Sequence, residues 1–208
     1  SLPARSPSPG NTGTAGLADV NAAIDNLFNH PNVGPFLSLR LIQRFITSNP
    51  TPGYIDRVAA RFNDNGSGVR GDLKAVVKAM LLDSEARDPA MMDLPAWGKL
   101  REPVLRVVNF ARAFNAASTS GYYPLDQFSI DHLQDPLNAP SVFNFFRPGY
   151  VPPNTGFSAR GATSPEFQIV NESTTANWVN KAEALSGNGL GWTGTANDVS
   201  SNYSTLAG

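Results

Sequence analysis

Apolar residues recur at three- and four-residue intervals through most of the chain, which is the spacing of one face of an α-helix. This period predicts helices over residues 17–28, from about 35 to 47, and over 54–62, and His, Pro or Gly residues close each run. A fourth helix is expected to begin after Asp72, a good N-cap residue. We predict that its apolar side chains face inward: Leu73, Val76, Val77, Met80 and Leu81.

The second half of the chain repeats this period in proline-marked stretches. A helix is predicted over residues 102–114, with its proline in the first turn. A shorter helix is predicted for residues 124–134, and Ser141 is a candidate cap for one or two turns. In Ser164-Pro165-Glu166 a cap candidate, a proline and an early acid come together, which predicts a long helix from there to Leu185.

Strand-like alternation and solenoid-length repeats are not visible, so the sequence indicates an all-α fold. We predict a multi-helix orthogonal or bundle-like domain of about six to eight helices, with long connecting loops. Residues 1–16 are rich in Pro, Ser and Gly and are expected to be a disordered or linker lead-in. The helical domain is predicted to span residues 17–185, and the Gly/Ser/Asn-rich residues 186–208 are expected to be a loop leading into a missing segment.

The segment at residues 139–154, APSVFNFFRPGYVPPN, places three Phe and one Tyr between prolines with little charge. Burying such a side chain stabilises a fold by about 1.5–3 kcal/mol, so these rings are expected to be core or contact surface. Packing between two helical layers is preferred over a sugar- or peptide-binding cleft. If a ligand binds here, the candidate residues of the segment are Phe143, Asn144, Phe145, Phe146, Arg147 and Tyr150.

Composition narrows the function classes. The chain has 16 Lys and Arg against 17 Asp and Glu, and this balance argues against nucleic acid as the main partner. The absence of cysteine excludes disulfides, thiolate metal sites and a cysteine nucleophile. No run approaches the ~18 apolar residues of a membrane span, and the first residues lack the apolar region of a signal peptide. We expect no cofactor and no membrane span in this chain.

Six segments in order carry a resemblance to a known family: residues 27–37, 41–53, 57–74, 98–104, 140–154 and 164–170. Over residues 15–206 the sequence resembles the bacterial "domain of unknown function 1800" family. Proteins similar to this are longer, so the chain is expected to be the C-terminal half of a member, truncated at both ends. The resemblance implies an exported protein, secreted or periplasmic or at the cell surface. The implied partner is the remainder of the parent polypeptide or an envelope protein, and no catalytic residue is implied.

The loop RFNDNGSGVRGD at residues 61–72 is compatible with a weak calcium hypothesis. Asn63, Asn65 and Asp72 fall at the third, fifth and twelfth places of an EF-hand-like register. Arg61, however, occupies the first place, where a carboxylate is needed. A glycine turn capped by Asp72 is therefore the preferred interpretation.

His30 and His132 are the only histidines, so a transition-metal site would need both, with carboxylates such as Asp131 or Asp135. His30 is better explained by its place at the end of the first helix, where an imidazole interacts well with free carbonyl groups. The pair Asp131-His132 is ambiguous, because nothing in the sequence places a nucleophilic serine beside it.

Lys99 and Arg101 stand before a helix start, where the positive end of the helix dipole disfavours cations. They are candidates to hold an anion or to pair with acids elsewhere in the fold, and structural pairing is preferred. Arg40 and Arg44 lie one turn apart and predict a solvated positive face.

The sequence thus favours a structural or interaction role at the cell envelope. The alternative is a hydrolase-like enzyme acting on an extracellular polymer, with its site shared with the missing N-terminal half. A cleft holding two carboxylates, or a histidine beside a hydroxyl group, would favour the enzyme. A broad apolar face would favour assembly.

Overall fold

The computed structural model describes residues 14–118, 121, 123, 132–187, 190–191 and 197–200. The chain divides into two compact units, Ser1–Trp97 (unit 1) and Gly98–Gly208 (unit 2). The described residues are mostly helical, which confirms the all-α class predicted from the apolar period. In this part of the chain, no helix is both long and apolar enough to cross a membrane.

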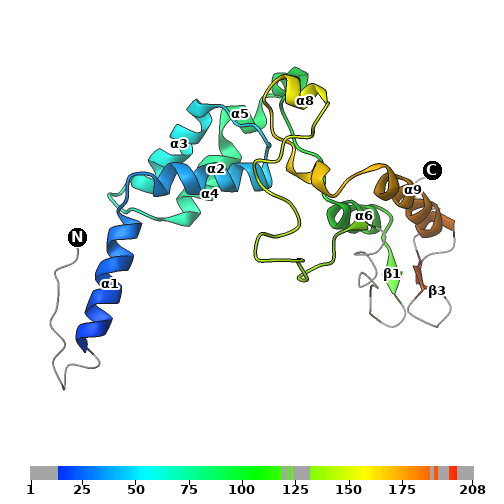
Figure 1. The fold of residues 1–208 in the computed structure, drawn as a ribbon, viewed down its shortest axis with the longest axis horizontal. Coiled ribbons are helices and arrows are strands. Elements are labelled where there is room, and N and C mark those ends of the chain that lie inside the picture. Colours follow the sequence, from blue (N-terminus) through cyan, green and yellow to red (C-terminus); the bar gives the residue numbers. More distant parts are fainter. Residues whose placement is uncertain are drawn as a thin grey trace. The chain divides into compact units, whose positions relative to one another are not determined.

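Unit 1 contains the four helices that the sequence predicts. They are α1 (Thr14–Phe28), α2 (Val33–Phe45), α3 (Pro52–Asn63) and α4 (Leu73–Leu82), followed by α5 (Ser84–Arg87) and the 3-10 turn η1 (Pro89–Asp93) (Figure 1). Thr51 caps α3 through its hydroxyl group, which accepts the Tyr54 N–H at 3.2 Å. Asp72 caps α4 by accepting the Ala75 N–H at 3.1 Å, as predicted.

The core of unit 1 lies where α2, α3 and α4 meet. Its buried members are Ile42, Tyr54, Val58, Phe62, Val76 and Met80. The hydroxyl group of Tyr54 donates to the Met80 carbonyl at 2.6 Å, so the buried phenol has its hydrogen-bond partner. Desolvation raises the pKa of this phenol, and the negative charges of Asp83 and Glu85 raise it further. The side chain is therefore a neutral part of the core.

The inward-facing prediction for α4 is only partly right. Val76 and Met80 are buried, whereas Leu73, Val77 and Leu81 are 55, 39 and 47% exposed. These three residues follow each other at intervals of four and form a stripe beside the buried one. The five apolar positions cover a wider arc of α4 than its neighbouring helices bury.

Unit 2 contains α6 (Pro103–Ala113), β1 (Ala117–Ser118), α8 (Gly156–Ala159), the 3-10 turn η2 (Pro165–Gln168), α9 (Glu172–Gly187), β2 (Leu190–Gly191) and β3 (Asn197–Ser200) (Figure 1). The helix α6 confirms the prediction for residues 102–114. The three strands form a small antiparallel sheet in the order β1-β3-β2, with Ala117 opposite Ser200 and Leu190 opposite Val199. Strands of two to four residues are too short to show an alternating pattern in the sequence.

The predicted helix from Ser164 to Leu185 is wrong in its continuity. The 3-10 turn η2 ends at Gln168, and α9 begins only at Glu172. The side chain of Asn171 accepts the Thr174 N–H at 3.0 Å, and the Thr174 hydroxyl accepts the Asn171 N–H at 2.9 Å. This reciprocal cap starts a new helix. Ser164, the predicted cap, makes no side-chain capping bond.

Three predictions fall partly outside the described residues. One is the C-terminal loop predicted for residues 186–208, of which the structure describes 186–187, 190–191 and 197–200. Most of the predicted helix at 124–134 also lies outside them, as do residues 1–13 of the predicted lead-in. The first helix begins at Thr14, three positions before the predicted start.

Candidate functional site

The candidate site is the loop of residues 135–150, called here the apolar loop. Leu137, Val142 and Phe143 are 106, 94 and 77% exposed. Single exposed apolar side chains are normal, but several on one loop mark a contact surface. The site is therefore built around these three side chains.

The first turn of the apolar loop displays Leu137. The Asn138 N–H donates to the Asp135 carbonyl at 3.1 Å, and the Asn138 side chain also donates to the Asp135 carboxylate at 3.1 Å. Leu137 itself has a φ of 62°. A bulky residue in this left-handed region is strained by about 1–3 kcal/mol. The leucine side chain at this strained position is fully exposed.

The second turn displays Val142 and Phe143. The Ser141 hydroxyl accepts the Phe143 N–H at 3.2 Å, and the Ser141 carbonyl accepts the Asn144 N–H at 3.1 Å. Asn144 has a φ of 68°, which asparagine tolerates better than most residues. Ser141 thus closes a turn rather than starting the helical turns predicted from the sequence.

The base of the apolar loop is tied to η2. The Arg147 N–H donates to the Gln168 side chain at 2.9 Å, and the Ser164 N–H donates to the Tyr150 carbonyl at 2.9 Å. One bond from η2 and one from the residue before it therefore hold the C-terminal arm of the loop in place.

A buried ion pair in turn anchors η2. The Lys99 ammonium lies 3.0 Å from the Glu166 carboxylate, and the two side chains are 15% and 2% exposed. Lys99 is thus held in the structural pairing that the sequence analysis preferred. The other oxygen of Glu166 is buried and has no hydrogen-bond partner among the described residues. Removing one member of a buried pair leaves an uncompensated charge, so this contact fixes η2 strongly.

A second buried carboxylate fixes the residues just before the apolar loop. Glu102 is 1% exposed and accepts the Gln134 side-chain N–H at 2.6 Å. The Gln134 side chain also accepts the Val104 N–H at 3.1 Å. Both arms of the loop are therefore tied to residues 99–104, directly through Gln134 and through η2.

The structure distributes the predicted site residues unevenly. Phe143 and Asn144 lie at the exposed tip of the apolar loop, Phe145 and Phe146 are half-buried, and Arg147 and Tyr150 lie at its base. Lys99 reaches the same base through Glu166, while Arg101 is exposed. Sequence reasoning missed Leu137 and Val142, because a proline-bracketed loop has no period that reports exposure.

The side-chain oxygens of the calcium candidates accept hydrogen bonds from other residues of the same loop. Asn65 accepts the Ser67 N–H at 2.9 Å and the Val69 N–H at 3.3 Å. Asp72 accepts the Asn65 side chain at 2.8 Å, and this bond is the main reason why its pKa is lowered, with the Ala75 N–H second. Asn63 accepts a hydrogen bond from Arg70. The described residues hold no group of three or more His, Asp or Glu that could bind a metal ion.

The two histidines occupy separate environments. His30 follows α1 in unit 1, where its ring accepts the Asn32 N–H at 3.2 Å. His132, in unit 2, is 1% exposed and meets the Trp178 ring edge-on, with 6.3 Å between ring centroids. Asp131, the other residue of the pair that the sequence left ambiguous, lies outside the described residues.

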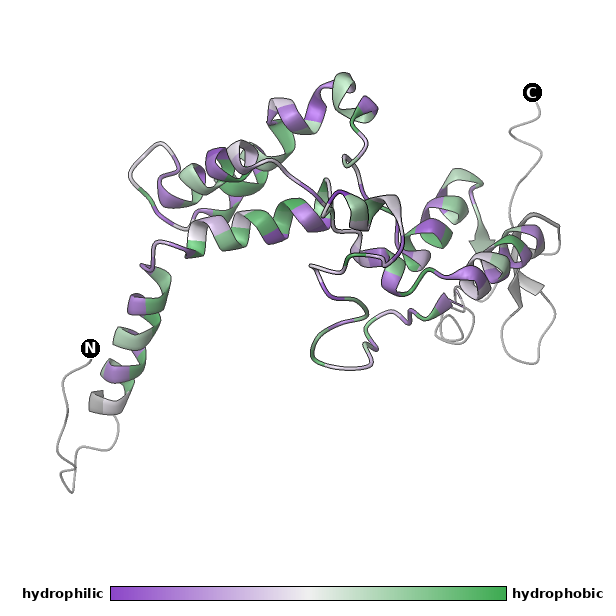
Figure 2. Ribbon diagram, turned by 45° about the horizontal axis from the view of Figure 1, so that its top comes forward, coloured by the Kyte–Doolittle hydropathy of each residue, from purple (hydrophilic) through white to green (hydrophobic). Residues whose placement is uncertain are grey.

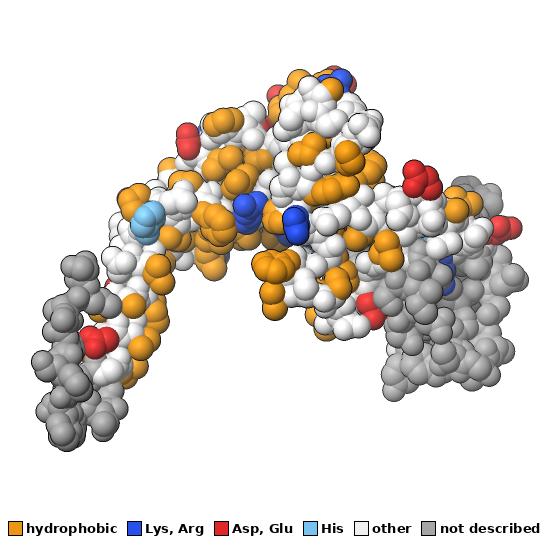
Figure 3. All heavy atoms as spheres, viewed as in Figure 1, with side chains coloured by type: hydrophobic (Ala, Val, Ile, Leu, Met, Phe, Trp, Pro, Cys, Tyr) orange, Lys and Arg blue, Asp and Glu red, His pale blue; other side chains and the backbone are white. Residues whose placement is uncertain are grey.

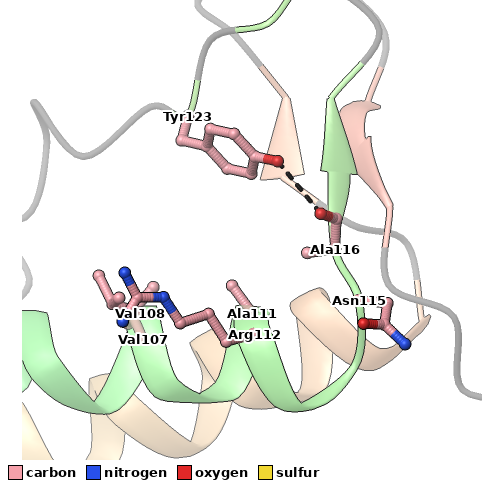
Figure 4. A pocket seen from close by; sticks show the side chains of 7 residues that line it. All are labelled: Val107, Val108, Ala111, Arg112, Asn115, Ala116 and Tyr123. Carbon is pink, nitrogen blue, oxygen red and sulfur yellow. Dashed lines mark hydrogen bonds between the residues drawn. The ribbon is translucent and has the colours of Figure 1, made fainter.

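Unit 2 also contains a cavity of about 550 Å³ against the C-terminal half of α6 (Figure 4). The described lining residues are Val107, Val108, Ala111, Arg112, Asn115, Ala116 and Tyr123. The Tyr123 hydroxyl group donates to the Ala116 carbonyl at 3.1 Å (Figure 4). The size suits a small molecule. However, these seven residues offer no acid-base pair, and none is a predicted site residue.

Comparisons with known proteins bear on the family rather than on the activity. The comparisons with curated proteins and with solved structures found no match to the chain. A family match extends over residues 6–204 and so includes all six segments that carry the resemblance. The chain therefore belongs to the family described as "Protein of unknown function (DUF1800)".

Proposed function

We propose that this protein has an interaction role, in which the apolar loop docks into an apolar pocket of another protein. The observation that carries the proposal is the exposure of Leu137, Val142 and Phe143 on one loop. Binding energy at protein interfaces concentrates in a few large side chains that become fully buried in the complex. These three side chains supply such a cluster.

The fixed base of the apolar loop supports the same function. Arg147 is hydrogen-bonded to Gln168 in η2, Tyr150 is hydrogen-bonded to Ser164 just before η2, and Lys99 holds η2 through Glu166. A loop that is already ordered loses less conformational entropy when it binds, so more of its contact energy appears as affinity. The hydrogen bonds and the ion pair at the base thus hold in place the loop that carries the three exposed side chains.

The chemistry of the apolar loop indicates the kind of partner. Between residues 135 and 150 the only charged residues are Asp135 and Arg147. One basic residue gives little attraction to nucleic acid or to anionic lipids. A protein with an apolar pocket and a polar rim fits this loop better.

The cell envelope is part of the proposal as the location, since the family resemblance implies export. The hydrolase-like alternative has less support from the geometry. It requires carboxylates in an open cleft, whereas Glu102 and Glu166 are buried and are held by Gln134 and Lys99.

A thiol introduced into the cysteine-free chain tests the proposal. Val142→Cys places it in the apolar loop and keeps Phe143, while Val69→Cys, at a residue 51% exposed in unit 1, is the matched control. In purified protein both thiols should react rapidly with a maleimide. In the cells that naturally produce the protein, Cys at 142 should react at least tenfold more slowly, and Cys at 69 should not change.

Equal reaction rates at position 142 in both settings would contradict the interaction role. The control also reports location, because a membrane-impermeant maleimide should label position 69 on intact cells if the protein is exposed at the cell surface. A protein in the periplasm should be labelled only after the outer membrane is permeabilised.

A further inference from the structure

The helix α1 carries an apolar stripe that its own unit leaves uncovered. Leu17, Val20, Ile24 and Leu27 follow helical spacing and are 60, 54, 56 and 66% exposed. Figure 2 shows the hydrophobic residues along α1, and in Figure 3 orange side chains follow one edge of this helix. An exposed stripe three turns long is larger than the scattered apolar residues normal for a protein surface.

The C-terminal end of α1 is firmly attached to unit 1. Arg70 donates to the Phe28 carbonyl at 3.1 and 3.2 Å and to the His30 carbonyl at 3.2 Å, while its guanidinium lies over the Phe28 and Phe62 rings. The backbone of Gly71 also packs against the Phe28 ring. These contacts fix where the helix starts from unit 1 and leave its apolar stripe to be covered by something else.

The helix α4 carries a second stripe of the same kind. Leu73, Val77 and Leu81 are 55, 39 and 47% exposed and lie at intervals of four residues. Both stripes are exposed in the single chain, so neither is covered by the other within one copy.

The charges beside the two stripes are complementary. The helix α1 contains Asp19 and Asp25 and no basic residue, whereas α4 contains Lys74 and Lys78 and no acidic residue. On a helical wheel, Asp19 and Asp25 lie on the two sides of the α1 stripe, and Lys74 and Lys78 lie on one side of the α4 stripe. Opposite charges at an interface rim steer the correct pairing.

We infer that the α1 stripe of one copy packs on the α4 stripe of a second copy, in a two-fold symmetric dimer. Two-fold symmetry repeats the contact, so that α1 of each copy packs on α4 of the other copy. The repeat matters because stable interfaces bury at least roughly 1,200 Å², more than one short helix pair supplies. The dimer lies in unit 1 and does not depend on the apolar loop of unit 2.

The oligomeric state of the full chain gives the first test. Light scattering after size exclusion should return twice the monomer mass of 22.2 kDa. Ile24→Asp and Val77→Asp should each yield a monomer, because each buries a charge in the interface. Leu94→Asp, at a residue 49% exposed outside both stripes, should stay dimeric. The inference would be overturned if the unsubstituted chain is a monomer, or if both stripe variants remain dimeric.

Cross-linking keeps the test informative if a charged variant fails to fold. Two single-cysteine proteins, Ile24→Cys and Val77→Cys, are made at different sizes by a tag and mixed under mild oxidation. The expected product is a disulfide-linked species joining the two sizes, formed at least tenfold faster than by either protein alone. Faster cross-linking of Ile24→Cys to itself would show that α1 pairs with α1 and would refute the α1–α4 contact.

Discussion

Arg57 and Asp83 form a charged contact in unit 1 that is held by two hydrogen bonds. The guanidinium donates two hydrogen bonds of 2.7 Å to the two carboxylate oxygens, and it also lies 3.5 Å from Glu85. Glu85 in turn accepts the Thr51 N–H at 3.0 Å. Arg57 thus joins the middle of α3 to the junction between α4 and α5, and Glu85 joins the start of α3 to the same junction.

This contact is expected to make the free energy of unfolding depend on pH. The hydrogen bond from Arg57 is the main cause of the lowered pKa of Asp83, and the Glu85 N–H lowers it further. Because the folded pKa lies below the unfolded value of about 4, the stabilisation is complete above pH 4 and is lost as the pH falls through the folded pKa. Asp83→Asn should therefore reduce the loss of unfolding free energy between neutral and acid pH.

The measurement is urea unfolding of both proteins at a series of pH values. Asn preserves the cap on α5, so the substitution acts mainly on the charge. Asp56→Asn, at an exposed acid of α3, is the control and should keep the parent's acid sensitivity. Parallel pH curves for the parent and Asp83→Asn would refute this role for the pair.

At the level of single residues, the roles that depend on neighbouring residues in the sequence could be predicted. Asp72 was expected to cap α4 and does so. Arg70, by contrast, reaches back 42 residues to the end of α1. A contact between residues so distant along the chain leaves no local pattern, so the role of Arg70 required the structure.

At the level of elements, the contact between Gly71 and Phe28 sets how α1 joins unit 1. A Cβ atom at Gly71 would lie 2.5 Å from the tip of the Phe28 ring, and its φ is 81°. Gly71→Ala should therefore both strain the backbone and displace α1. Gly68→Ala is a matched control, because Gly68 has a φ of 76° and nothing within 4 Å of the added methyl group.

We expect Gly71→Ala to lower the free energy of unfolding by about 1–3 kcal/mol more than Gly68→Ala, since overpacking costs about this much. Chemical denaturation of the two variants measures the difference. The double variant Gly71→Ala, Phe28→Ala should show less than the sum of the two single losses, because removal of the ring relieves the clash. Equal losses at both glycines would show that Phe28 does not constrain this turn.

The four longer helices of unit 1 could be predicted because an apolar stripe of 10 to 15 residues is a strong signal. The same stripe does not say whether a partner covers it, as Leu73 and Val77 on α4 show. The interruption before α9 was missed because an early proline and acid suggested one helix, while the cap formed by Asn171 and Thr174 acts only five residues later.

At the level of the whole molecule, the sequence indicated one helical span, whereas contacts divide the chain between Trp97 and Gly98. No shift in composition marks that point. Family membership could be predicted, because six ordered segments carry it. The candidate site was predicted in part: the aromatic segment was singled out, but packing was preferred for rings of which Phe143 is 77% exposed.

The most direct test of the interaction role replaces Phe143 by a photoreactive benzoylphenylalanine in the cells that naturally produce the protein. Phe45, an exposed phenylalanine on α2, is the matched control position. Irradiation should give one adduct of defined mass from position 143 that is absent from position 45, and Leu137→Ser together with Val142→Ser should abolish it. No adduct at position 143, or one that survives the two serine substitutions, would contradict the account.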